Sequence, residues 1–338
     1  GIKLFMPVIF SGLLLISVVL GIILTFTDKE KSRSTKITSL PFSQRKNAIK
    51  VINIYNIIEY EKMVPYVLSS LRIAQKSNNI KGVILRINSG GGTVGASQEI
   101  YRRILRFKAD LRRMKKANPS AEIKPVVAVM GDIAASGAYY IACSTDRIIA
   151  RPGTLTGSIG VIMNSFTFKK LFDKVGIKQE IVKSGKFKAI GSAIGRDRRP
   201  EETELLQDIV DETYKQFFNA VLNGRNAVLA KDKRLDKDFL RRYADGRILN
   251  GEFARKIHLI DQLGGLEEGV EQIKVLYQKM NNGKKLGSLT LIEDNKSPLL
   301  QLIQLLGNRS HASLSVTDFI KNYSQGVPLY LYTGWKGR

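Results

Sequence analysis

The sequence predicts a mixed α/β protein with a largely parallel sheet. Short apolar runs rich in valine and isoleucine, at 49–58, 81–87 and 126–130, have the composition of buried strands. Helix-length segments at 62–76 and 94–116 separate them. This alternation is typical of parallel strands joined by helical crossovers. A hydrophobic content of 43% with 25% charged residues fits an ordinary globular core.

Further elements are predicted after the third strand. We expect a short helix near 139–143, a helix at 168–175, a strand at 179–182 and a long helix that opens at Pro200 and ends at Gly224. Proline followed by two glutamates is a common helix start. One face of the long helix repeats apolar residues, which predicts packing against the core. These residues are Leu206, Val210, Tyr214, Phe217 and Val221.

The N-terminal segment predicts a membrane anchor. Leu4 to Phe26 contains no charged residue, and 23 helical residues span about 35 Å, enough to cross a bilayer. A cleaved signal peptide would have a shorter apolar region and a small-residue cleavage site, whereas no alanine occurs before Ala48. We therefore expect an uncleaved transmembrane helix within 1–27, followed by a polar linker at 28–46.

The charge balance is strongly positive. The chain has 54 basic and 30 acidic residues, a net charge of +24, which suits contact with anionic headgroups or nucleic acid. Only Tyr101 and Phe107 interleave the densest basic segment, so stacking on single-stranded bases is poorly supported and no nucleic acid partner is expected. A solvated face is the default, and contact with anionic lipid is the preferred functional alternative. The cations of this segment are Arg102, Arg103, Arg106, Lys108, Arg112, Arg113, Lys115 and Lys116.

Metal and disulfide chemistry have few candidate residues. The chain holds one cysteine, Cys143, and two histidines, His258 and His311. One cysteine excludes an intramolecular disulfide, and this set argues against a zinc site. We expect no metal.

A glycine-rich turn imitates a cofactor motif. Gly90, Gly92 and Gly95 satisfy the GxGxxG pattern between a strand and a helix. The acidic residue that would bind the ribose is expected about 20 residues further on. Asp110 lies in the middle of the basic helix, and Asp132, at the end of the next strand, comes too late. We therefore expect no cofactor.

A candidate nucleophile lies between the third strand and the following helix. Gly131-Asp132 is predicted to break the strand, and Ser136 follows among small residues. A serine at a strand-to-helix step lies beside unpaired N–H groups, where the helix dipole favours developing negative charge. The alternative is a serine that is merely tolerated in a tight turn.

A serine nucleophile needs a base. His258, in an Ile-His-Leu-Ile run, fits an ordinary packed or surface residue better than a base. A lysine kept neutral by burial can replace histidine, as in Ser–Lys variants of the catalytic triad. The segment 180–190 offers Lys183, Lys186 and Lys188, each of which could equally be a solvated cation.

Three motifs in combination resemble one family. The segments NSGGG (88–92), ASGAYY (135–140) and TLTGSIGVIM (154–163) are similar to those of the bacterial signal peptide peptidase A (SppA) family, membrane-anchored serine peptidases with a Ser/Lys dyad. The resemblance covers roughly 49–270. In the family an aromatic residue directly precedes the dyad lysine, after a Ser/Thr-Gly turn. That pattern selects Lys188, behind Phe187.

The resemblance also implies roles for the neighbouring residues. Ser158 matches a family position whose hydroxyl hydrogen-bonds the lysine amine; by itself it could be a turn serine. The oxyanion donors would be the N–H of Gly137 and that of Gly92 or Gly91. The chain departs from the family at Gly90 and Ala193, where proline is common; these departures affect the neighbouring loops.

The fold implied by the resemblance is that of Clp protease and the crotonases, with stacked β-strands and helices packed outside. The peptidase domain would span 47–285 and a C-terminal extension 286–338. Apolar pieces of the extension, 299–306 and 327–332, could pack on a neighbouring protein or on lipid. The resemblance implies a homo-oligomer, in which a neighbouring subunit can supply the dyad lysine.

The function implied is that of a serine endopeptidase that degrades remnant signal peptides and other membrane-derived peptides. The resemblance implies the bacterial inner membrane, with the catalytic domain on the extracytoplasmic side. The charge bias favours the opposite orientation, because four basic residues follow the predicted anchor within ten residues and only Lys3 precedes it. Two alternatives are a crotonase-like acyl-coenzyme A hydratase or isomerase and a non-catalytic membrane scaffold.

Overall fold

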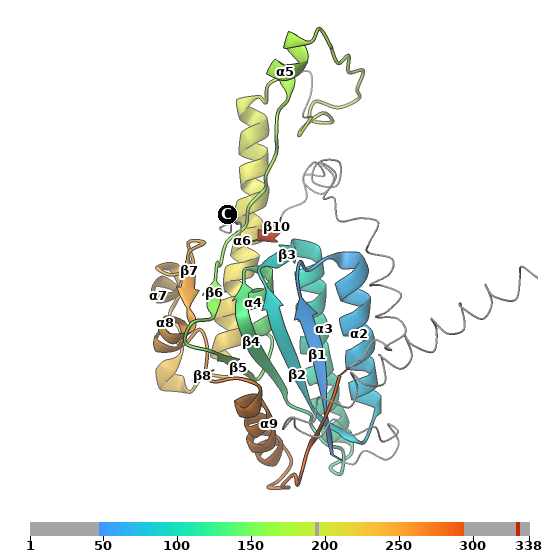
Figure 1. The fold of residues 1–338 in the computed structure, drawn as a ribbon, viewed down its shortest axis with the longest axis vertical. Helices are drawn as coiled ribbons and strands as arrows, with labels where there is room; N and C mark the ends of the chain where they lie inside the picture. The colour runs from blue at the N-terminus through green and yellow to red at the C-terminus, as the bar shows by residue number, and fades with distance from the viewer. Residues whose placement is uncertain (1–46, 193–195, 294–328, 332–338) are drawn as a thin grey trace, which may run out of the picture. The chain divides into compact units, whose positions relative to one another are not determined.

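Parallel strands form the centre of the fold, as predicted (Figure 1). The computed structural model describes residues 47–192, 196–293 and 329–331. Within them, an eight-stranded sheet has the order β7-β6-β4-β2-β1-β9, and β5 and β8 branch from β4. Its strands are β1 (Ala48–Tyr55), β2 (Ile80–Ser89), β4 (Val126–Ala135), β5 (Arg147–Ala150), β6 (Leu155–Gly157), β7 (Ile248–Asn250), β8 (Gln262–Leu263) and β9 (Thr290–Ile292).

Strand β4 has two different neighbours along its length. Its first half pairs with β5, and Ile133–Ala135 pair with β6. Between the halves, the register with β2 shifts. There the side chain of Asn88 accepts the N–H groups of Asp132 and Ile133 at 3.0 and 3.1 Å. The prediction that Gly131-Asp132 breaks the strand was therefore wrong, because a side chain replaces the missing ladder bonds.

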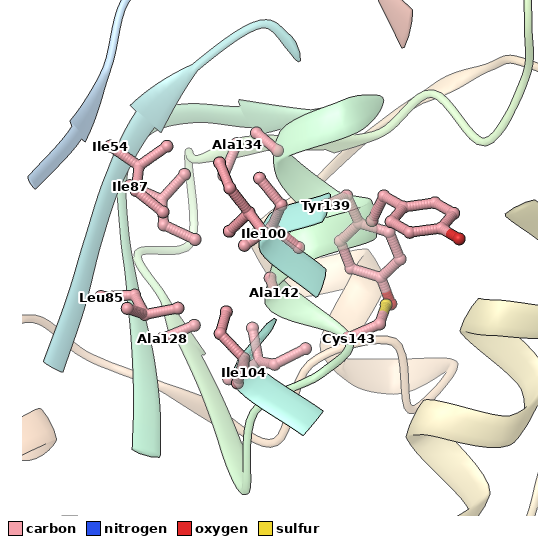
Figure 2. Close-up of a cluster of buried hydrophobic side chains, with 14 of the residues drawn as sticks. Ile54, Leu85, Ile87, Ile100, Ile104, Ala128, Ala134, Tyr139, Ala142 and Cys143 are labelled. Carbon is pink, nitrogen blue, oxygen red and sulfur yellow. The ribbon is translucent and has the colours of Figure 1, made fainter. Parts of the chain in front are cut away.

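Helices cover both faces of the sheet. On one face lie α2 (Tyr60–Lys76), α3 (Val94–Ala117) and α4 (Gly137–Ala142), and on the other lies α9 (Leu266–Met280). Because strand residues alternate in direction, Leu85 and Ile87 pack with α3 and α4 (Figure 2). Ile84 packs on the other face, under α9. The apolar alternation of β2 thus builds two cores.

A projecting segment extends beyond the sheet. We call residues 161–210 the arm; it contains α5 (Lys169–Lys174) and the start of α6 (Pro200–Asn226) (Figure 1). No described residue between Gly160 and Glu201 is buried. The strand predicted at 179–182 is absent, because this stretch lies exposed in the arm without a neighbouring strand to pair with.

The apolar face predicted for α6 is buried in the core only along the second half of the helix. Phe217 and Val221 are fully buried, whereas Leu206 and Val210 are half-buried. The helix also continues past Gly224, to Asn226. A Cβ at Gly224 would lie 2.3 Å from the carbonyl oxygen of Cys143, so this glycine permits close packing of α6 on the end of α4.

The predicted anchor and linker lie outside the described residues. From Asn47 onward, none of the described helices combines the length and the apolar character needed to span a membrane. In the C-terminal extension, β9 adds to the sheet beside β1, and β10 (Leu329–Leu331) pairs with the short strand β3 (Gly91–Thr93).

Candidate active site

Ser136 occupies a strained backbone position between β4 and α4. Its φ of 55° and ψ of −124° are rare for a residue with a Cβ, and such conformations persist only where the surroundings hold them. Here its N–H donates to the carbonyl of Gly157 at 2.9 Å, and its own carbonyl accepts the N–H of Tyr140 at 2.9 Å. The turn is therefore held at both ends by backbone bonds.

The hydroxyl of Ser136 is buried without a partner. The residue is 1% exposed, and its Oγ makes no hydrogen bond to any of the described residues. Buried polar atoms are nearly always paired, and an exception calls for an explanation such as a catalytic role. The small residues Ala135, Gly137 and Ala138 surround it, and Gly137 opens α4, so the Gly137 N–H has no acceptor within the helix.

The structure brings Ser158 beside Ser136. Ala135 and Gly157 are register partners on the parallel strands β4 and β6, so the two serines follow at adjacent strand ends. Ser158 is 7% exposed and has a φ of 50°. Its N–H donates to the carbonyl of Arg247 at 2.8 Å, which anchors this second turn.

The glycine-rich turn distinguishes Gly92 from Gly91. The N–H of Gly91 donates to Ser89 Oγ at 3.1 Å and is thereby engaged. Ile58 lies along one edge of β3: its N–H donates to the Gly91 carbonyl at 3.0 Å, and its carbonyl accepts the N–H of Thr93 at 3.0 Å. Because successive strand residues point to opposite edges, the N–H of Gly92 faces the other edge. A Cβ at Gly92 would lie 2.1 Å from the Ile58 oxygen, so only glycine fits.

That other edge of β3 holds β10. The strands are antiparallel, with Tyr330 opposite Gly92, and β10 also lies against α4. The expectation that 327–332 pack on a neighbour or on lipid thus needs correction, since residues 329–331 pair within the chain. The sequence showed an apolar run, but no local signal could name its partner more than 200 residues away.

Lys188 lies in the arm, apart from Ser136. It is exposed, in a turn between α5 and α6, and this segment projects away from α4 in Figure 1. Its ammonium contacts no acceptor in the described part of the chain, whereas Lys183 Nζ donates to the Lys186 carbonyl at 2.6 Å and Lys186 pairs with Glu201 at 2.5 Å. One copy of the chain does not bring the two predicted dyad residues together.

A buried ion pair supports α4 from the side remote from Ser136. The Arg225 guanidinium, 1% exposed, donates to both oxygens of Asp261 at 3.0 and 2.8 Å. Asp261 also accepts the N–H of Ile148, and Tyr139 donates its hydroxyl to Leu259. His258 contributes its carbonyl to Arg225. These bonds join α4, α6 and β5 into one rigid support.

Fold and site together fit a hydrolase with a serine nucleophile. Residues 118–279 match the family model described as Peptidase family S49. A protein of Synechocystis sp., named as a candidate protease, is 36% identical over 276 residues, covering 79% of this chain and 89% of the relative. A candidate signal peptide peptidase SppA of Enterococcus faecium is 30% identical over 278 residues, covering 79% of this chain and 73% of the relative. The chain belongs to peptidase family S49.

Among solved structures, a variant of the membrane-bound stomatin-specific protease 1510-N, in complex with a substrate peptide, aligns with a TM-score of 0.46 at 17% identity, over 78% of this chain and 99% of that one. The family makes this protein a serine peptidase. The acyl-coenzyme A hydratase and scaffold alternatives gain no support from the comparisons.

Proposed function

We propose that this protein is a membrane-anchored serine endopeptidase in which Ser136 is the nucleophile and Lys188 of a neighbouring copy is the base. The observation that carries the proposal is the Ser136 hydroxyl, held on a strained turn, buried and without a partner. A hydroxyl in that state has been desolvated without receiving a proton acceptor. A lysine amine from another copy would supply the missing proton acceptor for the Ser136 hydroxyl.

The position of Lys188 favours a shared dyad. A lysine acts as a base only through its neutral amine, and burial in an interface between copies would favour that neutral form. The arm exposes apolar side chains that a second copy would cover. The most exposed are Phe166, Leu171, Val175, Ile177 and Val182.

The chemical steps follow from this arrangement. The neutral Lys188 amine takes the proton of Ser136 as Oγ bonds to the peptide carbonyl carbon. The N–H groups of Gly137 and Gly92 receive the oxyanion, and Ser158 orients the amine. Protonated Lys188 gives its proton to the leaving nitrogen as the C–N bond breaks. Lys188 then deprotonates a water molecule as its oxygen bonds to the acyl carbon, and returns that proton to Ser136 Oγ as the ester C–O bond breaks.

Substrates would bind as an added strand on β3, in the place that β10 occupies in this structure. An edge strand with a free ladder recognises extended peptides through main-chain bonds. The pairing of β10 with β3 supports this, because it shows that the edge accepts an antiparallel segment. Remnant signal peptides and other membrane-derived peptides are the substrates we propose, at the bacterial inner membrane with the catalytic domain on the extracytoplasmic side.

Mixed oligomers test the shared dyad. Ser136→Ala and Lys188→Ala should each abolish peptide cleavage, while Lys183→Ala, a matched arm lysine, keeps it. Co-assembly of the two inactive variants should restore part of the activity, because some interfaces then combine an intact serine with an intact lysine. Full activity of Lys188→Ala alone would refute the mechanism, and failure of proven mixed oligomers to regain turnover would refute the shared dyad.

A further inference from the structure

One face of α3 is a continuous basic surface, and most of its cations pair with no carboxylate of the described chain. The opposite face is buried through Ile100, Ile104, Phe107 and Leu111. The exposed face carries five cations at helical spacing and no exposed acidic residue. We call this surface the basic stripe; its members are Arg102, Arg106, Arg112, Arg113 and Lys116.

The other cations of α3 serve the fold. Lys108 pairs with Asp146 at 2.8 Å, both side chains being largely buried. Lys115 donates to the carbonyl of Ala121 at 3.1 Å, and Arg103 donates to Gln75 at 3.4 Å. Within the basic stripe, by contrast, only Arg113 has a carboxylate partner in the described chain, Asp110. Four of the five cations are thus available to an external anion.

Exposed apolar side chains lie on the same pair of helices, α3 and α2. Leu105 and Met114 are 40% and 48% exposed on α3, and Ile73 is 45% exposed on the adjacent helix α2 (Figure 1). Cations that pair with phosphate and apolar groups that enter the headgroup layer are the composition of a surface that lies on a bilayer.

The aromatic residues of α3 do not fit a nucleic acid surface. Phe107 is fully buried, and Tyr101 packs edge-on against Tyr140 with ring centroids 4.8 Å apart. Neither ring is free to stack on an exposed base, which single-stranded nucleic acid binding uses. The structure therefore favours lipid over nucleic acid as the anionic partner.

The C-terminal end of the basic stripe lies at the end of the sheet where the described chain begins. Helix α3 runs from β3, at the carboxyl end of β2, back toward β4, whose first residue Val126 pairs with Val83. The C-terminal end of α3 thus lies at the end of the sheet where β1 begins at Ala48.

We propose that the basic stripe docks on anionic lipid headgroups and so holds the peptidase against the membrane surface. The inference rests on the membrane anchoring of the proposed function, and not on the Ser136–Lys188 chemistry. Attraction between exposed charges and a lipid surface is screened beyond about 8 Å at physiological salt, so docking should weaken as salt rises.

The test uses the full chain in nanodiscs, either of phosphatidylcholine alone or of equal parts phosphatidylcholine and phosphatidylglycerol. A fluorophore is attached at Met114→Cys, and lipids with a quencher at the headgroup report proximity. Val275→Cys on α9, 56% exposed on the opposite face of the sheet, is the control site. Cys143 is buried, and burial raises the pKa of its thiol to about 12, so it should not react.

Docking predicts quenching at position 114 in anionic discs only, with its loss at high salt and none at position 275. Triple reversal of Arg106, Arg112 and Lys116 to glutamate should reduce the quenching to the level of position 275. Triple reversal of three exposed cations elsewhere, Lys231, Lys233 and Lys237, makes the same charge change and should leave it intact.

Three outcomes would overturn the inference. They are equal quenching in neutral discs, quenching that survives reversal of the basic stripe, and a gain in polarisation of labelled single-stranded DNA that the stripe reversal abolishes. Peptide cleavage in detergent, measured on the same variants, keeps the two proposals apart. Stripe reversal should leave cleavage unchanged, while absent cleavage with intact quenching would count against the proposed function alone.

Discussion

The sheet around Ser136 and the arm around Lys188 differ in almost every physical respect. Ser136 is buried among buried neighbours, and backbone hydrogen bonds to Gly157 and Tyr140 hold its conformation. Lys188 lies between Gly160 and Glu201, where no described residue is buried. The core can hold a strained nucleophile because packing offsets the cost of strain, whereas the arm leaves the Lys188 side chain exposed to solvent. In the proposed function, this contrast means that the base becomes competent only when a second copy covers the arm.

The largest effect should come from Ser136→Ala. We expect peptide turnover to fall at least about 10³-fold, because the nucleophile is gone and only the oxyanion donors remain. Stability should hardly change, since the Oγ makes no hydrogen bond that could be lost. Peptide turnover measures the loss of activity, and urea unfolding measures whether the stability is unchanged. A parallel loss of stability would mean that Ser136 is a structural turn residue.

Breaking a buried ion pair of the core should lower the free energy of unfolding more than breaking an exposed ion pair of the arm. Arg225→Ala strands Asp261 in the core and should reduce the free energy of unfolding by roughly 3–5 kcal/mol. Glu201→Gln breaks a half-exposed arm pair with Lys186 and should cost less than about 1 kcal/mol. Equal costs in denaturant titrations would show that the arm is as firmly built as the core.

Removal of β10 should raise activity. A chain that ends at Pro328 leaves the β3 edge open, and turnover of a peptide substrate should increase several-fold because the substrate no longer competes with Leu329–Leu331. A chain that ends at Tyr332 keeps the strand and should behave as the full chain does. Lower turnover in the shorter chain would show that β10 builds the site instead of competing for it.

Strong acid should loosen the arm by protonating Glu202. The Glu202 carboxylate accepts from Arg196 at 2.5 and 2.7 Å and from Arg199, and these bonds hold its pKa below the ordinary value of 4.5. Because the folded pKa is lowered, its stabilisation is present above pH 4.5 and is lost as pH falls through the lowered value. Glu202→Gln should imitate that loss at neutral pH, with faster hydrogen exchange at 186–199 and unchanged exchange in β2 and β4. Unchanged exchange in the arm would contradict it.

The smallest effect on stability should come from Val182→Asp. This side chain is fully exposed in the single chain, so the urea midpoint should not move. The same change should shift sedimentation toward smaller species if the arm is covered in an oligomer. Unaltered sedimentation would show that Val182 is not covered in an interface between copies.

Local sequence patterns predicted the sheet and its covering helices well. The apolar runs of β1 and β2, and the helical stretches of α2 and α3, lie within a few residues of their expected bounds, because propensity and periodicity act over one or two turns. The patterns failed where a distant residue decides. Asn88 carries β4 past Gly131, and 179–182 contains strand-forming residues but finds no partner.

By itself, the sequence determined the surroundings of the candidate nucleophile: a buried strand, a run of small residues around Ser136 and a helix start immediately behind it. It also named Ser158 and the glycine turn through motifs. The tertiary structure decided the rest. It paired β4 with β6, so that Ser136 and Ser158 follow at adjacent strand ends. It bonded the Gly91 N–H to Ser89 and left the Gly92 N–H facing β10. It also placed Lys188 in the exposed arm. The physical reason is range: local preferences act between near neighbours, whereas the approach of residues 50 or 200 positions apart depends on which packed surfaces exclude water best.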